Sequence, residues 1–154
     1  MDATKDWRIE APDRDGLAEW RRMRHALWPE MSEAENVQET KALAEGPNAF
    51  VRLARDGRGR TAGFAEATLR TDYVNGCETS PVVFLEGIYV EPWARRHGTA
   101  RRLVEVVQQW ARQRNCSEMA SDALLENTDS HGMHLALGFE ETERVVCFRK
   151  VLTR

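Results

Sequence analysis

The stretch YVEPWARRHGTARRLVEVV, Tyr89–Val107, decides the expected fold, because a β-like segment passes through Pro92 into a basic loop and then into an amphipathic helix. The basic residues cluster around a single glycine, Gly98: Arg95, Arg96, Arg101 and Arg102. Apolar residues then recur at helical spacing and form one stripe suited to pack against a sheet: Ala100, Leu103, Val104, Val107, Trp110 and Ala111. This order predicts a strand, loop and helix of an α/β protein.

The same junction has the features of a phosphate-binding loop. Gly98 lets the backbone turn tightly and approach a ligand, since it carries no Cβ. The unpaired N–H groups and the dipole of the following helix add partial positive charge. The pattern is neither the Gly-Lys-Ser/Thr loop of nucleotide hydrolases nor the three-glycine dinucleotide motif. The alternative is a solvated helix start without a ligand.

The rest of the chain alternates strand and helix patterns without repeats or linkers. Asp13 is expected to cap the first helix, Ser32 and Glu35 have capping-box spacing for the second, and Gly138 should end the last. The predicted order is strand 7–11, helix 13–28, helix 32–44, strands 49–56, 61–72 and 82–90, helix 99–111, strand 118–122, helix 130–137 and a strand pair within 139–152. The sequence therefore predicts an α/β fold with a mixed central sheet of about seven strands and about four helices.

Composition indicates one globular domain, residues 1–154, with a net charge of −3 from 22 Lys and Arg against 25 Asp and Glu. This acidic balance argues against a nucleic-acid binder. No apolar run reaches the roughly 18 residues of a membrane span, and the N-terminus lacks the apolar core of a signal peptide, so a cytoplasmic location is expected. Cys77, Cys116 and Cys147 are interpreted as reduced thiols, and the histidines have no metal-binding spacing, so no metal is expected.

Two carboxylates have positions that indicate function. Glu86 interrupts the apolar strand VVFLEGIYV, where an unpaired charge is costly. Alternation places it on one face with Phe84, Ile88 and Val90. Asp122 ends the next strand, at an edge where open α/β sheets bind ligands. The alternative for Glu86 is a structural glutamate paired with a core arginine, and the alternative for Asp122 is an ordinary helix cap. Because Ser117–Glu143 holds seven acidic residues and no Lys or Arg, this region is suited to a cationic partner.

These motifs resemble the GCN5-related N-acetyltransferases. Arg95, Gly98 and Ala100 occupy the positions of the family's Arg/Gln-x-x-Gly-x-Gly/Ala signature for acyl-CoA. Asn127 followed by HLALGF (134–139) resembles its second motif, although an ordinary helix cap is the alternative for Asn127. The resemblance implies acetyl-CoA as co-substrate and a sheet splayed between its fourth and fifth strands.

A narrower resemblance, to bacterial aminoglycoside 6′-N-acetyltransferases, involves the segments DYVNG, SPVVFLEGIYV, EMASD and GFEETERV. It implies acetyl transfer to the 6′-amino group of an aminoglycoside, and hence antibiotic resistance. Residues implied to contact acetyl-CoA are Ile88, Tyr89, Val90, Arg95, Arg96, His97, Gly98, Thr99, Ala100, Arg101 and Asn127. Those implied to contact the aminoglycoside are Trp28, Tyr73, Glu86, Asp122 and Glu143.

The chemistry requires a group that accepts the proton of the amine, and Asp122 and Glu86 are the candidates. A backbone N–H near Val90 can polarise the thioester carbonyl. His134 stands where the family often has a tyrosine that protonates the thiolate; a packed, hydrogen-bonded histidine is the alternative. Other functions that remain open are acetylation of a polyamine or protein N-terminus, and non-catalytic acyl-CoA binding. The C-terminal strand can complete its own sheet or pair across a homodimer, which is the expected partner arrangement.

Overall fold

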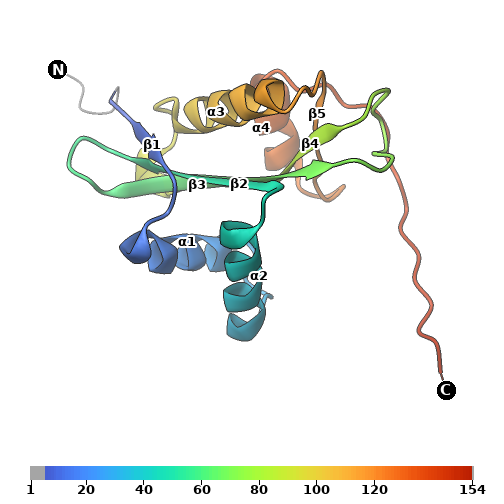
Figure 1. Cartoon of the computed structure of the whole chain (residues 1–154), viewed down its shortest axis with the longest axis horizontal. Coiled ribbons are helices and arrows are strands. Elements are labelled where there is room, and N and C mark those ends of the chain that lie inside the picture. Colours follow the sequence, from blue (N-terminus) through green and yellow to red (C-terminus); the bar gives the residue numbers. More distant parts are fainter. Residues whose placement is uncertain (1–5, 154) are drawn as a thin grey trace. The chain divides into compact units, whose positions relative to one another are not determined.

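The computed structural model describes residues 6–153, which form two compact units dividing between Asp122 and Ala123 (Figure 1). The interpretation of the N-terminus as lacking a signal peptide lies partly outside these residues. The single-domain organisation stays a prediction. No helix within 6–153 has the length and apolar character needed to cross a membrane.

The first unit contains a mixed sheet in the order β1-β2-β3-β4-β5. The strands are β1 (Arg8–Glu10), β2 (Ala49–Arg55), β3 (Thr61–Arg70), β4 (Val82–Val90) and β5 (Met119–Ser121). Neighbours from β1 to β4 pair antiparallel, and β5 pairs parallel with β4. The predicted mixed α/β sheet is therefore confirmed for this unit.

Helices cover both faces of this sheet. Helices α1 (Arg14–Leu27) and α2 (Glu33–Glu45) lie on one face, and α3 (Thr99–Gln113) lies on the other (Figure 1). The second unit contains α4 (Thr128–Ala136), followed by an extended segment. Four α-helices in the described residues match the predicted number.

Local hydrogen bonds explain where α1 and α2 begin. The side chain of Asp13 accepts a hydrogen bond of 2.6 Å from the N–H of Gly16. Ser32 Oγ accepts from the N–H of Glu35 at 3.1 Å, and Glu35 returns a bond to the N–H of Ser32 at 3.2 Å. Both predicted caps are confirmed, because each satisfies N–H groups that the first turn leaves unpaired.

The apolar core lies on both faces of the sheet, where helices pack against it. Between the sheet and α1 it contains a cluster of buried apolar side chains: Trp20, Met23, Val51, Leu53 and Phe64. On the other face, the predicted stripe of α3 is buried at Leu103, Val104, Val107, Trp110 and Ala111. The apolar periodicity therefore predicted correctly which side of α3 meets the sheet.

A β-bulge in β4 changes the expected orientation of Glu86. Glu66 of β3 pairs with Gly87, whereas Ala67 pairs with Leu85, so Glu86 is the extra residue. The alternation resumes one residue later, and Ile88 then lies on the opposite face to Glu86. The expectation of a shared face was correct for Phe84, which precedes the bulge, but wrong for Ile88 and Val90, because strict alternation holds only where no residue is inserted.

The seven-strand prediction was also wrong, since the described residues form five strands. The expected strand pair within 139–152 is absent, and this segment is extended without a ladder. Its apolar side chains are exposed: Val145, Val146, Phe148, Val151 and Leu152. The residue types favour β-structure, but a strand also needs a partner for its backbone groups, and within its own unit this segment has none.

Candidate active site

The loop between β4 and α3 is shaped by residues in the left-handed conformation. Arg96 has φ 65° and Gly98 has φ 79°. The hydroxyl of Thr99 donates to the carbonyl of Ala94 at 3.1 Å, and Arg95 Nε donates to the carbonyl of Val90 at 2.9 Å. Side chains therefore satisfy loop carbonyls, while the first-turn N–H groups of the 15-residue helix α3 point into the loop.

The geometry of this loop suits an anionic group. A Cβ placed at Gly98 would meet no atom within 4 Å, so the backbone faces open space there. Aligned N–H groups, the helix dipole and flanking arginines together attract an anion. His97 is held by its carbonyl, which accepts a 3.3 Å bond from Trp7 Nε1.

The edge of β4 opens next to this loop. Pairing with β5 ends at Leu85 and Ser121, whereas β4 continues to Val90. The N–H of Glu91 donates to Ala62 of β3 at 2.7 Å, so by alternation the N–H and C=O of Val90 point away from β3. An N–H donor thus lies at the edge of β4 that β5 leaves uncovered.

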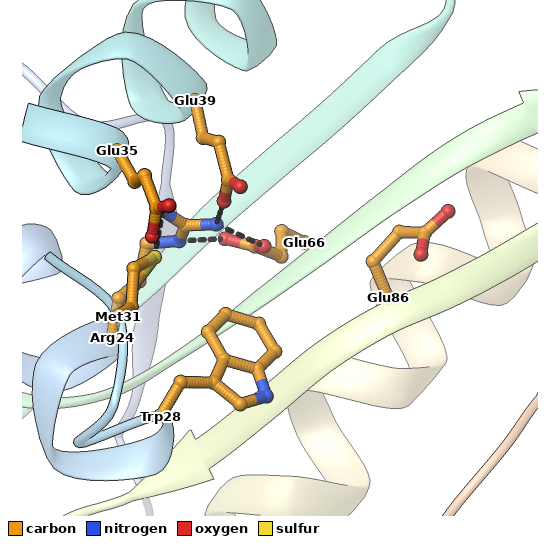
Figure 2. A pocket seen from close by; sticks show the side chains of 7 residues that line it. All are labelled: Arg24, Trp28, Met31, Glu35, Glu39, Glu66 and Glu86. Carbon is orange, nitrogen blue, oxygen red and sulfur yellow. Dashed lines mark hydrogen bonds and ion pairs between the residues drawn. The ribbon is translucent and has the colours of Figure 1, made fainter. Parts of the chain in front are cut away.

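A pocket of about 370 Å³ lies between the α1–α2 helices and the sheet (Figure 2). Its walls carry four carboxylates, one guanidinium, one indole and one thioether. The lining residues are Arg24, Trp28, Met31, Glu35, Glu39, Glu66 and Glu86. The sequence-predicted residues Trp28 and Glu86 come together here. The other five lining residues were not anticipated. The excess of carboxylates and the indole ring suit a cationic ligand.

Glu86 is bound on only one of its carboxylate oxygens. Oε1 accepts bonds from Thr68 Oγ1 at 2.6 Å and from Arg70 Nη2 at 2.7 Å. Glu86 is therefore tied to an arginine, as one alternative held, but the side chain of Arg70 is 39% exposed and is not a core residue. Within the described chain, Oε2 makes no such bond and stays available to a ligand.

Asp122 lies immediately beyond the last residue pair of the β4–β5 ladder. Because Ala120 pairs with Phe84, alternation places Asp122 on the face that Phe84 and Glu86 share. Asp122 is exposed and does not line the pocket. The alternative that it caps a helix was wrong, since α4 is capped by Asn127.

A buried ion pair behind the pocket was missed by sequence analysis. Arg24 is 2% exposed and Glu66 is 2% exposed, and Arg24 Nε donates to Glu66 Oε2 at 3.0 Å. Trp20 Nε1 donates to the same oxygen at 3.0 Å. Burial raises the pKa of the Glu66 carboxyl, and the Arg24 guanidinium opposes that shift. Glu66 interrupts the apolar strand TAGFAEATL as Glu86 interrupts its own, and that signal could have identified it.

Trp28 forms a wall of the pocket at the C-terminal end of α1. The backbone N–H of Trp28 donates to the backbone carbonyl of Arg24 at 2.8 Å, and the indole ring lies over Gly87 of β4. A Cβ at Gly87 would be 2.5 Å from Cη2 of Trp28, too close for any side chain without displacement. A glycine in β4 is therefore required by the position of the ring.

Tyr73 is 78% exposed and lies in the loop between β3 and β4. The carboxylate of Glu118 holds the far part of this loop, since it accepts from the N–H of Glu78 at 2.9 Å and of Thr79 at 2.7 Å. The Thr79 hydroxyl also donates to Glu118, and this bond is the largest cause of the lowered pKa of Glu118. Tyr73 does not line the pocket.

The remaining predicted residues belong to the second unit. Asn127 Oδ1 accepts from the N–H of Ser130 at 3.2 Å, so Asn127 is a helix cap. His134 Nδ1 donates to the carbonyl of Ser130 at 2.7 Å. The imidazole ring packs edge-on against the ring of Phe139, with the two ring centroids 5.2 Å apart. This matches a packed, hydrogen-bonded histidine, and the catalytic role of His134 stays a prediction. Glu143 is exposed in the extended segment.

No group of three or more His, Cys, Asp or Glu side chains suited to a metal occurs in residues 6–153. The three cysteines are free thiols.

Comparison with known proteins identifies the family to which this chain belongs. The model of the acetyltransferase (GNAT) family matches residues 17–139. The chain belongs to this family, and its α/β fold with a mixed sheet is the GNAT fold.

Particular relatives are similar over nearly the whole chain. The aminoglycoside N(6′)-acetyltransferase type 1 of Serratia marcescens is 51% identical over 140 residues, which cover 91% of this chain and 96% of the relative. The structure of AAC(6′)-Iy in complex with the bisubstrate analogue CoA-S-monomethyl-acetylneamine has a TM-score of 0.89 at 42% identity, covering 96% of this chain and 99% of that one. The 6′-N-acetyltransferase AAC(6′)-Ih from Acinetobacter baumannii has a TM-score of 0.91 at 43% identity, covering 96% of this chain and 100% of that one.

Proposed function

We propose that this protein transfers the acetyl group of acetyl-CoA to the 6′-amino group of aminoglycosides and thereby confers resistance to them. The observation that carries the proposal is the arrangement around β4: a basic loop with helix N–H groups at its end, and a carboxylate-rich pocket on the α1–α2 face. The names of relatives at 43–51% identity over most of the chain agree with it.

The pocket is suited to the acceptor because aminoglycosides carry several ammonium groups on saturated sugar rings. Carboxylates pair with such groups, and an indole face binds both cations and the apolar faces of sugars. Trp28 and Glu86 are the proposed contacts within the pocket. Tyr73, Asp122 and Glu143 are proposed as further aminoglycoside contacts on the basis of the sequence resemblance.

The donor side uses the end of β4 and the loop after it. Acetyl-CoA supplies the activated acetyl group as a thioester. We assign its pyrophosphate to the loop Arg95–Arg101, its pantetheine arm to the edge Ile88–Val90, and a further contact to Asn127. The N–H of Val90, directed away from β3, is the proposed donor to the thioester carbonyl oxygen.

In the reaction a C–N bond forms and the C–S bond breaks, and the amine must lose a proton. Glu86 or Asp122 accepts that proton directly or through a water molecule. His134 is the proposed group that protonates the departing thiolate. Its Nδ1 proton is used in the bond to Ser130, so only the doubly protonated ring can donate from Nε2.

Three broader assignments accompany the function. The chain is proposed to act as one domain and in the cytoplasm, where its free cysteines stay reduced. It is proposed to form a homodimer, because the extended C-terminal segment exposes a row of apolar side chains with β-favouring character.

A thiol-release assay with acetyl-CoA tests the function directly. Kanamycin, neomycin, spermidine and a peptide panel are the acceptors, and the site of acetylation on the product is determined by NMR. Rapid turnover of the aminoglycosides with acetylation at the 6′-nitrogen is the expected result. Turnover of spermidine or peptides alone would identify another amine acetyltransferase, and acetyl-CoA binding without turnover would identify a binding module.

A further inference from the structure

Arg24 is the buried centre of a hydrogen-bond network that joins three elements of the first unit (Figure 2). Its Nε and Nη2 donate to the two oxygens of Glu66 on β3, at 3.0 and 3.2 Å. On α2, Nη1 donates to Asn36 Oδ1 at 2.9 Å and Nη2 donates to Glu39 Oε2 at 2.7 Å. These four bonds fix both the place and the plane of the guanidinium.

The same guanidinium lies against Trp28. Its central carbon is 5.0 Å from the centroid of the indole ring, within the range of a cation–π contact. The ring also touches β4 at Gly87, as the 2.5 Å approach to a Cβ at that position shows. Trp28 is therefore in contact with a locked cation on one helix and with the backbone of a central strand.

We propose that Arg24 is a positioning residue for the acceptor, acting through Trp28: it holds the indole as a fixed wall of the pocket. This inference rests on the proposed function, in which the aminoglycoside packs on that ring. Arg24 lines the pocket, but it is only 2% exposed and its guanidinium nitrogens already donate to Glu66, Asn36 and Glu39. It also belongs to α1, which lies on the face of the sheet opposite to α3 (Figure 1). Its effect should therefore appear in the binding of the acceptor and not in that of acetyl-CoA.

Arginine is suited to this task and lysine is not. A planar guanidinium can donate to Glu66, Asn36 and Glu39 in its own plane while its face stays against an aromatic ring. An ammonium group keeps the charge that Glu66 needs, but it makes at most three bonds and presents no planar face. Arg24→Lys thus removes the fixed plane and preserves the net charge of the pocket.

Two variants separate position from charge and from folding. Arg24→Lys keeps one positive charge beside Glu66. The double variant Arg24→Met with Glu66→Met removes one charge of each sign and fills the space with apolar side chains, a replacement that buried ion pairs often tolerate. The matched control is Arg21→Lys, since Arg21 also joins α1 to α2, through a 2.8 Å bond to Thr40, but does not line the pocket.

Steady-state kinetics and NMR of each purified full-length variant test whether Arg24 positions Trp28. The KM for kanamycin should rise about tenfold in both Arg24 variants, while the KM for acetyl-CoA stays within about twofold of wild type. In ¹⁵N-tryptophan-labelled protein, the indole resonance of Trp28, assigned with Trp28→Phe, should move in both variants. Arg21→Lys should change none of these quantities, and a general loosening of the α1–α2 packing would change them in all three.

The kinetic and NMR measurements also distinguish failure of this inference from failure of the proposed function. An unmoved Trp28 resonance in both Arg24 variants, or a kanamycin KM within about twofold of wild type, would overturn the positioning role. If the wild-type protein acetylates no aminoglycoside, the proposed function fails, and the NMR arm alone then decides whether Arg24 positions Trp28.

Discussion

At the scale of residues, the proposed mechanism assigns the acceptance of the proton to one of two carboxylates that share one face of the sheet. Glu86 protrudes at the bulge of β4, and Asp122 follows the last pair of the β4–β5 ladder. We expect the variant that removes the general base, Glu86→Gln or Asp122→Asn, to lower kcat by about 100-fold or more, since such bases contribute roughly 10²–10⁴. The other variant should act on the KM for the aminoglycoside. Measuring kcat and KM from pH 5.5 to 9 distinguishes the two roles.

Glu45→Gln is the control for that experiment, because Glu45 is an exposed carboxylate of α2 that does not line the pocket. It should keep wild-type kinetics. Wild-type rates and pH dependence in both Glu86→Gln and Asp122→Asn would remove these carboxylates from the mechanism.

Part of the candidate site could be predicted from the amino-acid sequence. Glu86 was found because a charge in an apolar strand must have a role or a partner, and Trp28 came from the family resemblance. Glu66 meets the same criterion, but its partner Arg24 is 42 positions earlier in the chain, and no local pattern connects them. The inserted residue at Glu86 is likewise invisible to alternation, which assumes an unbroken ladder.

At the scale of elements, the turn between β2 and β3 depends on one buried carboxylate. Asp56 accepts bonds from the N–H groups of Arg58 at 2.9 Å and Arg60 at 2.8 Å, and from Arg60 Nε at 2.7 Å. Burial acts to raise the pKa of Asp56, but these bonds prevail and lower it. The folded-state pKa thus lies below the unfolded one, so the stabilisation is present above about pH 3.9 and is lost as pH falls through the folded value.

Asp56→Asn keeps an acceptor oxygen and removes the charge. We expect it to lower the free energy of unfolding by about 1 kcal/mol at pH 7, the difference between a charged and a neutral acceptor. Urea unfolding at pH 7 and pH 3.5 measures this loss, which should shrink at the lower pH. Asp72→Asn, at an exposed aspartate, is the control. A loss that stays constant or grows towards acid pH would contradict the assigned role of the Asp56 charge.

Elements with strong local signals were predicted best. Helices α1 and α2 begin at caps whose partners lie three residues away, and β4 was predicted with its observed bounds because a long apolar run suits a central strand. The segment 139–152 was predicted as strands on residue type alone. Its state depends on which backbone pairs with it, and that is not encoded in a local pattern.

At the scale of the whole molecule, the proposed homodimer provides a use for the exposed C-terminal segment. Val146 is 78% exposed and Phe148 is 93% exposed, and alternation places both on one face of a strand formed there. Isolated apolar side chains on a surface are ordinary, but a row in a β-favouring segment indicates a partner. If a second copy supplies that partner, charges on this face should prevent association, because burying an unpaired carboxylate is costly.

We therefore expect the wild-type protein to sediment as a dimer at micromolar concentration and the double variant Val146→Asp, Phe148→Asp to sediment as a monomer. Arg149→Glu places a negative charge on the neighbouring position, which alternation directs to the other face, and it should stay dimeric. Sedimentation velocity with far-ultraviolet circular dichroism separates loss of association from loss of folding. A monomeric wild type, or a double variant that remains dimeric, would show that this segment does not join two copies. A monomeric and folded double variant would instead make the apolar face of 146–148 the contact that holds the two copies together.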